Sequence, residues 1–156
     1  MATPTENIAR AYTDLVEINK TATKGYQEAA EGVTDPKLKS ELSRLSQQRA
    51  EFASVLTQHA SQFGINTKDE NTIEGALTDA AAAVHRGWIN IKSVVTGQND
   101  SAILGECETG DATALKAYEA ALSADLPAQA KSVIEQQHSQ ILTAKNMITQ
   151  WKGEAK

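Results

Sequence analysis

Long stretches in which apolar residues recur every three or four positions constrain this chain more than any other feature. In the first of them, Ile8, Tyr12, Leu15, Ala22 and Tyr26 fall on one side of a helix. The chain has only three prolines, and none lies inside such a stretch, so long helices are permitted. The periodicity predicts an all-α protein with helices at about 5–32, 35–63, 72–96, 100–123 and 126–152.

Capping signals mark the starts of two of these helices. Asp35 precedes Pro36, a combination typical of a helix start. The Asp35 carboxylate can accept hydrogen bonds from the unpaired backbone N–H groups of the first turn, and proline there has no N–H that would need a partner. The link before it is short, which predicts an antiparallel hairpin of the first two helices. Asn71 and Glu74 have the spacing of a capping box for the third helix. The length of 156 residues fits one domain, residues 1–156.

Two parts of the chain resemble each other and predict how the helices connect. Residues 24–30 match residues 116–122, so the first and last pairs of helices form similar hairpins. The helix at 72–96 would span about 24 residues, or roughly 36 Å, which is long enough to run the length of a bundle. Hairpin, long crossover and hairpin is the connection of a ferritin-like antiparallel four-helix bundle. A plain up-and-down bundle of five helices is the alternative.

Polar residues interrupt the apolar stripes near the middle of four helices. Asn19 and Asp111 each lie seven residues before a tyrosine of the repeat, Tyr26 or Tyr118. Burying polar groups costs free energy unless they find hydrogen-bond partners, so these groups are expected to meet. The sequence predicts one buried polar layer made of Asn19, Gln48, Arg49, Asp111, Gln137 and His138, with the hydroxyls of Tyr26 and Tyr118.

One part of this layer has the chemistry of a metal site. Glu135 and His138 form a Glu-x-x-His pair, and Asp111 would add a carboxylate. A di-iron bundle needs a carboxylate from each of two helices and a Glu-x-x-His from each of the other two. The first hairpin offers Asn19 and Arg49 instead, and a guanidinium cannot coordinate iron. We therefore predict a structural layer without metal or cofactor; an iron or manganese site at Asp111, Glu135 and His138 is the alternative.

Charge and composition exclude several classes of function. The formal net charge of −5 disfavours nucleic acid as a partner, because such a partner requires a basic face. No apolar run approaches a membrane span, and no N-terminal segment has the pattern of a signal peptide, so we expect a cytoplasmic protein without membrane contact. The single cysteine, Cys107, excludes an internal disulfide. His85 and Arg86 are expected to face solvent and are candidates for a partner surface.

Several segments together resemble a bacterial family of ferritin-like four-helix-bundle proteins of uncharacterised function. The segments are Asp14–Lys20, Lys24–Glu31, Gln47–Phe52, His85–Trp88 with Lys92-Ser93, and Glu106–Glu108 followed by Ala114–Tyr118. The resemblance extends from about residue 7 to residue 150. It implies a ferritin-like fold, a cytoplasmic bacterial protein distantly like rubrerythrins and bacterioferritins, and a role in stress physiology.

The function expected from these patterns is that of a non-catalytic bundle. It would act through self-assembly, as a homodimer or larger homo-oligomer, or through a protein partner. The alternative is an iron- or manganese-binding oxidoreductase that uses Asp111, Glu135 and His138.

Overall fold

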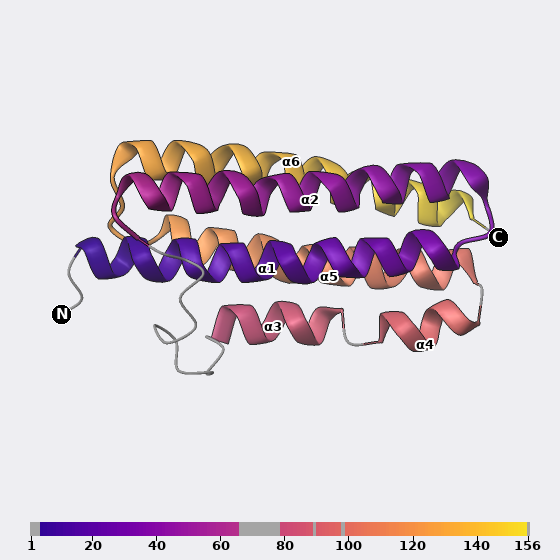
Figure 1. The fold of residues 1–156 in the computed structure, drawn as a ribbon. Coiled ribbons are helices and arrows are strands. Elements are labelled where there is room, and N and C mark those ends of the chain that lie inside the picture. Colours follow the sequence, from indigo (N-terminus) through magenta and orange to yellow (C-terminus); the bar gives the residue numbers. More distant parts are fainter. Residues whose placement is uncertain (1–3, 66–78, 89, 98, 156) are drawn as a thin grey trace.

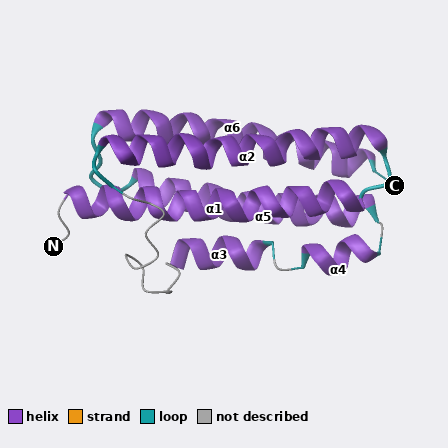
Figure 2. Ribbon diagram, in the orientation of Figure 1, coloured by secondary structure: helices purple, strands orange, loops and turns teal. Residues whose placement is uncertain are grey.

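The structure, a computed structural model, describes residues 4–65, 79–88, 90–97 and 99–155. These residues form helices joined by short turns, and no strand occurs among them (Figure 2). No helix in this part of the chain has the length and apolar character that crossing a membrane requires. The all-α prediction is confirmed, and the helices are α1 (Pro4–Gly32), α2 (Pro36–Gln62), α3 (Asp79–Gly87), α4 (Ile91–Thr96), α5 (Asp100–Leu122) and α6 (Ala128–Glu154).

The four long helices lie side by side as two hairpins (Figure 1). α1 and α2 form one antiparallel hairpin, and α5 and α6 form the other. The hairpins meet where α1 packs on α5 and where α2 lies beside α6. α3 and α4 follow one another along the face that α1 and α5 form, so α1 has neighbours on several sides.

The helix ends follow from local chemistry. The side chain of Asp35 accepts a hydrogen bond from the backbone N–H of Lys37 at 2.8 Å, and Pro36 is the first residue of α2, as the sequence predicts. Gly64, just beyond α2, has a φ of 75°, a conformation that glycine adopts without steric cost. Asn99 caps α5 through the backbone N–H of Ala102 at 3.0 Å. The predicted capping box at Asn71 and Glu74 lies outside the described residues.

The crossover segment differs from the predicted continuous helix at 72–96. Residues 72–78 are outside the described part, and the described remainder consists of α3 and α4 with a break between them. The break coincides with Trp88, whose indole enters between α1 and α5. A Cβ atom on Gly25 would lie 2.3 Å from this indole, and one on Gly110 would lie 2.2 Å from it. The crossover approaches both helices this closely because neither position carries a side chain.

Candidate functional site

A layer of buried polar side chains crosses the bundle at mid-length. Asn19 on α1, Arg49 on α2, Asp111 on α5 and Gln137 on α6 are each at most 4% exposed. All four belong to the polar layer that the sequence predicts, and we call them the central layer. Each long helix therefore contributes one residue of the central layer to a largely apolar core.

The charged half of the central layer is an ion pair between Arg49 and Asp111. The guanidinium donates to both carboxylate oxygens, at 2.6 and 3.2 Å, and both side chains are fully buried. The hydroxyl of Tyr26 donates to Asp111 at 2.5 Å, and the Tyr26 ring faces the guanidinium at 5.1 Å. The side-chain oxygen of Gln48 accepts from Nε of Arg49 at 3.1 Å. The carboxylate and the guanidinium thus satisfy each other, as buried charges must.

The pKa shifts fix the protonation states of this half. Burial, the largest single influence, lowers the pKa of Arg49, but the charge and hydrogen bond of Asp111 together with Tyr26 and Tyr118 outweigh burial, and the pKa lies above its usual value. Burial, and then the charge of Asp111, raise the pKa of Tyr26 well above 10, so its hydroxyl keeps the proton that it donates. The Arg49 side chain therefore remains a cation.

The neutral half of the central layer joins Asn19 to Gln137 through Tyr118. The amide nitrogen of Asn19 donates to the Tyr118 hydroxyl at 2.7 Å and to the carbonyl of Leu15 at 2.8 Å. The Tyr118 hydroxyl then donates to the side-chain oxygen of Gln137 at 2.7 Å. The Gln137 amide donates to the carbonyl of Phe52 at 3.4 Å. Burial raises the pKa of Tyr118, which keeps this chain of hydrogen bonds uncharged at neutral pH.

The three residues of the alternative metal site are not brought together. Asp111 is bound to Arg49, whereas Glu135 is exposed. His138, predicted in the polar layer, is partly exposed instead and pairs with Glu119 at 3.2 Å. Among the described residues, no group of three His, Cys, Asp or Glu side chains could hold a metal ion. The donor set therefore does not fit iron or manganese.

Cys107 lies next to the central layer but has no reactive character. Its side chain is fully buried, and burial, followed by the charge of Asp111, raises the pKa of the thiol well above its usual value. A protonated, inaccessible thiol is a weak nucleophile, so Cys107 acts as a small core residue.

The close packing of Trp88 against Gly25 on α1 and Gly110 on α5 was not predicted from the sequence. Trp88 is 4% exposed, and its ring meets the Tyr26 ring edge-on at a centroid distance of 5.0 Å. Its indole nitrogen has no hydrogen-bond partner among the described residues. The available signal was the presence of Gly25 and Gly110 inside helices, where glycine is otherwise unfavourable.

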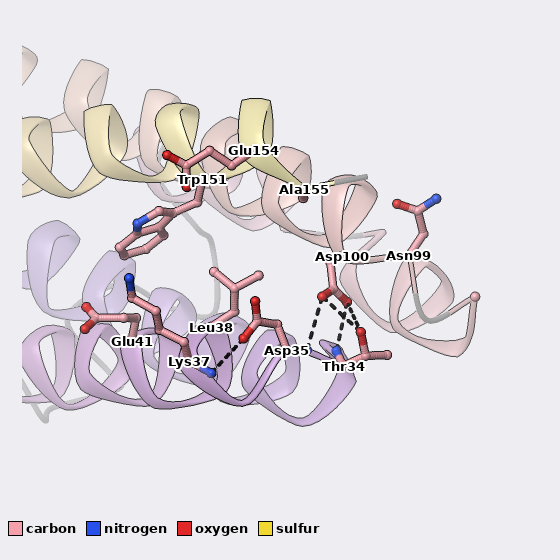
Figure 3. A pocket seen from close by; sticks show the side chains of 11 residues that line it. Thr34, Asp35, Lys37, Leu38, Glu41, Asn99, Asp100, Trp151, Glu154 and Ala155 are labelled. Atoms are coloured by element: carbon pink, nitrogen blue, oxygen red, sulfur yellow. Dashed lines mark hydrogen bonds between the residues drawn. The ribbon is translucent and has the colours of Figure 1, made fainter.

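A pocket of about 520 Å³ opens at the end of the bundle where the turn between α1 and α2 meets the start of α5 (Figure 3). Asp100 points at this turn and accepts from the backbone N–H groups of Thr34 and Asp35, at 2.8 and 3.2 Å. Trp151 and Leu38 face the pocket from the two hairpins. The Asp100 carboxylate is already hydrogen-bonded to the backbone of this turn. The role of Asp100 is therefore to join the two hairpins.

Comparison with known proteins identifies a family. A domain of unknown function (DUF2383) matches residues 7–124, well over half of the chain. The chain belongs to this family. No curated protein and no solved structure matches it. Within this family member, the ion pair of Arg49 and Asp111, with both tyrosines of the layer, lies inside the matched residues, whereas Gln137 lies beyond them.

Proposed function

We propose that the protein is a non-catalytic bundle of the ferritin-like plan that acts by binding at its surface. The order of elements supports the plan, because two similar hairpins flank a crossover segment. The direction of the helices agrees with it: α2 and α5 run the same way, as a crossover of full bundle length requires (Figure 1). α3 and α4 pack on one face of the four long helices, which favours this plan over five equivalent helices.

The observation that carries the non-catalytic assignment is the position of Arg49. In ferritin-like enzymes, carboxylates and histidines project into the bundle core to hold metal ions. Here a guanidinium, fully buried and bound to both oxygens of Asp111, lies at that level of the core. It supplies the positive charge that offsets the carboxylate, and it has no lone pair with which to coordinate a metal.

The surface supports a polar partner more than a large apolar interface between copies. Obligate homodimers bury extended apolar areas. Among the described residues, the one large hydrophobic side chain that is well exposed is Leu142 on α6, at 42%. We therefore favour partner binding over self-assembly as a homodimer or larger oligomer.

Metal analysis of the purified protein tests the non-catalytic assignment. After purification without chelators, we expect iron and manganese far below one ion per chain, and no oxidation of added Fe²⁺ above the buffer rate. His138→Ala should change neither result. Stoichiometric metal that Asp111→Ala or His138→Ala removes would overturn the proposal.

Sedimentation velocity tests the preference for a partner over self-assembly. We expect a monomer at micromolar concentration, unchanged by Leu142→Ser. A stable dimer that Leu142→Ser dissociates would instead support self-assembly through α6.

A further inference from the structure

A groove of about 370 Å³ lies where the crossover breaks over α1. α1 contributes one wall, and the end of α3 and the start of α4 contribute the other. We call it the basic groove, and its lining residues include Lys20, Lys24, Glu28, His85, Trp88 and Lys92. A volume of this size falls in the range of small-molecule sites, about 300–1,000 Å³.

The charge of the basic groove is opposite to that of the whole chain. The chain carries a formal charge of −5, yet Lys20, Lys24 and Lys92 line this groove with Glu28 as the only carboxylate among its lining residues. Such a local excess of positive charge in a concave surface attracts anions.

The lysines of the basic groove are loosely held. The ammonium of Lys20 lies 3.8 Å from Glu17, and that of Lys92 lies 3.9 Å from Glu28. Both distances exceed the length of an N–H···O hydrogen bond, about 2.7–3.2 Å. Lys24 is exposed and forms no ion pair with any described residue. These ammonium groups can therefore turn toward a ligand without breaking a strong interaction.

The floor of the basic groove is apolar, in contrast to its rim. Trp88 and Ile91, each 4% exposed, belong to its lining, and the indole packs against Gly25, which carries no side chain. An inorganic ion would use the rim alone, whereas a ligand with an apolar body would use both rim and floor.

We propose that the basic groove binds a small organic anion, with its carboxylate or phosphate held by Lys20, Lys24 and Lys92 and its apolar part over Gly25 and Trp88. The site deepens the proposed function, on which it rests, by naming a surface and a ligand class. His85, predicted as a partner-surface residue, lines this groove, whereas Arg86 is exposed outside it.

Tryptophan fluorescence can report on binding directly. The chain has two tryptophans, so Trp151→Phe leaves Trp88 as the sole tryptophan, which excitation at about 295 nm selects over the tyrosines. In this background we expect saturable changes with benzoate or phenyl phosphate, and the tighter of the two identifies the acid group. Inorganic phosphate should bind more weakly, because it lacks an apolar part. Benzyl alcohol, which has the ring without the charge, should give no saturable change.

Charge variants distinguish this site from general attraction of anions. Lys24→Glu should weaken binding of the better aromatic anion about tenfold. Lys131→Glu, the same change on α6, should leave it unaltered. Glu28→Gln should tighten binding about threefold, because a competing carboxylate is lost. Circular dichroism of each variant establishes that it is folded.

Several outcomes would overturn the site: no saturable change with either aromatic anion, an equal response to benzyl alcohol, or equal effects of Lys24→Glu and Lys131→Glu. These failures are separate from failure of the proposed function. If the protein contains no metal and does not bind the anions, only the proposed anion site is refuted. If it binds stoichiometric metal and also binds the anions, only the non-catalytic assignment is refuted.

Discussion

Tyr26 and Tyr118 occupy equivalent positions in the two similar hairpins, yet their surroundings differ in charge. Each hydroxyl bonds a group on the opposite hairpin: Tyr26 donates to Asp111, and Tyr118 accepts from Asn19. Tyr26 thus meets an ion pair, whereas Tyr118 joins two amides. The two similar hairpins therefore place their tyrosines alike, but only one tyrosine contacts charged groups. Asp111 is the one carboxylate of the central layer, and Arg49 supplies the cation that offsets its charge.

Breaking the charged half should have the largest effect on stability. Asp111→Asn leaves the Arg49 cation buried without its counter-charge, so we expect a loss of about 3–5 kcal/mol in the free energy of unfolding. Urea unfolding followed by circular dichroism measures it. Asp125→Asn, the same change at an exposed turn residue, should cost less than about 0.5 kcal/mol.

A compensating variant tests the cause of that loss. Adding Arg49→Met to Asp111→Asn removes the orphaned cation and should recover more than half of the lost stability. The ion-pair account fails if Asp111→Asn and Asp125→Asn are equally mild, or if the double variant recovers nothing.

The two hairpins also differ at the residue before each tyrosine, Gly25 or Ala117. Gly25→Ala would place a Cβ atom 2.3 Å from Trp88, so we expect destabilisation by about 1–3 kcal/mol in thermal or urea unfolding. Gly105→Ala is the matched control, because the nearest atom to its new Cβ, on Lys152, lies 3.9 Å away. That substitution should stabilise α5 by about 0.5–1 kcal/mol. Equal stabilisation by both variants would contradict the close packing of Trp88 against Gly25.

Alkaline pH should destabilise the protein through Tyr26 and Tyr118. Each pKa is raised in the folded state, so an unfolded tyrosine releases its proton near the usual pKa of 10 while the folded one retains it. The contribution is complete below pH 10 and is lost as pH rises, by about 1.4 kcal/mol per pH unit for each tyrosine.

Tyr26→Phe and Tyr118→Phe should each reduce this dependence, measured by urea unfolding between pH 9 and 11 with tyrosinate absorbance as a second reading. Lysine titration is common to the variants and the parent, so it cancels in the comparison. An unchanged slope in both variants would show that neither tyrosine is held neutral by the fold.

The smallest effect is expected at His138, beside the neutral half. Its pairing with Glu119 is partly exposed, so His138→Ala should change stability by less than about 0.5 kcal/mol. Gln137→Ala, at the adjacent buried position, should lower the free energy of unfolding by about 1–3 kcal/mol, because it removes the oxygen that accepts the hydrogen bond of the Tyr118 hydroxyl. A larger loss of stability for His138→Ala than for Gln137→Ala would show that His138 belongs to the buried polar layer, as the sequence predicted.

The sequence predicted the central layer well because interruptions of an apolar stripe are local and visible. Asn19, Arg49, Asp111 and Gln137 each replace an apolar residue on the buried face of a helix. The prediction for His138 was wrong because neighbouring residues on a helix point about 100° apart, so only Gln137 of the two enters the core. The break at Trp88 was missed because periodicity shows which residues are buried, and not whether the helix is continuous.

The sequence by itself determined the long helices, the hairpin turn at Asp35 and Pro36, and the polar group that each long helix brings to mid-length. These follow from the 3.6-residue period and from capping chemistry, which act over a few neighbours. Only the tertiary structure decided that Arg49 pairs with Asp111, which is 62 residues away, and that Tyr118 joins Asn19 to Gln137. Partner choice in the core depends on which helices lie together and how closely. In this chain, the ion pair between the two hairpins binds Asp111, the one buried carboxylate of the layer, to a side-chain cation.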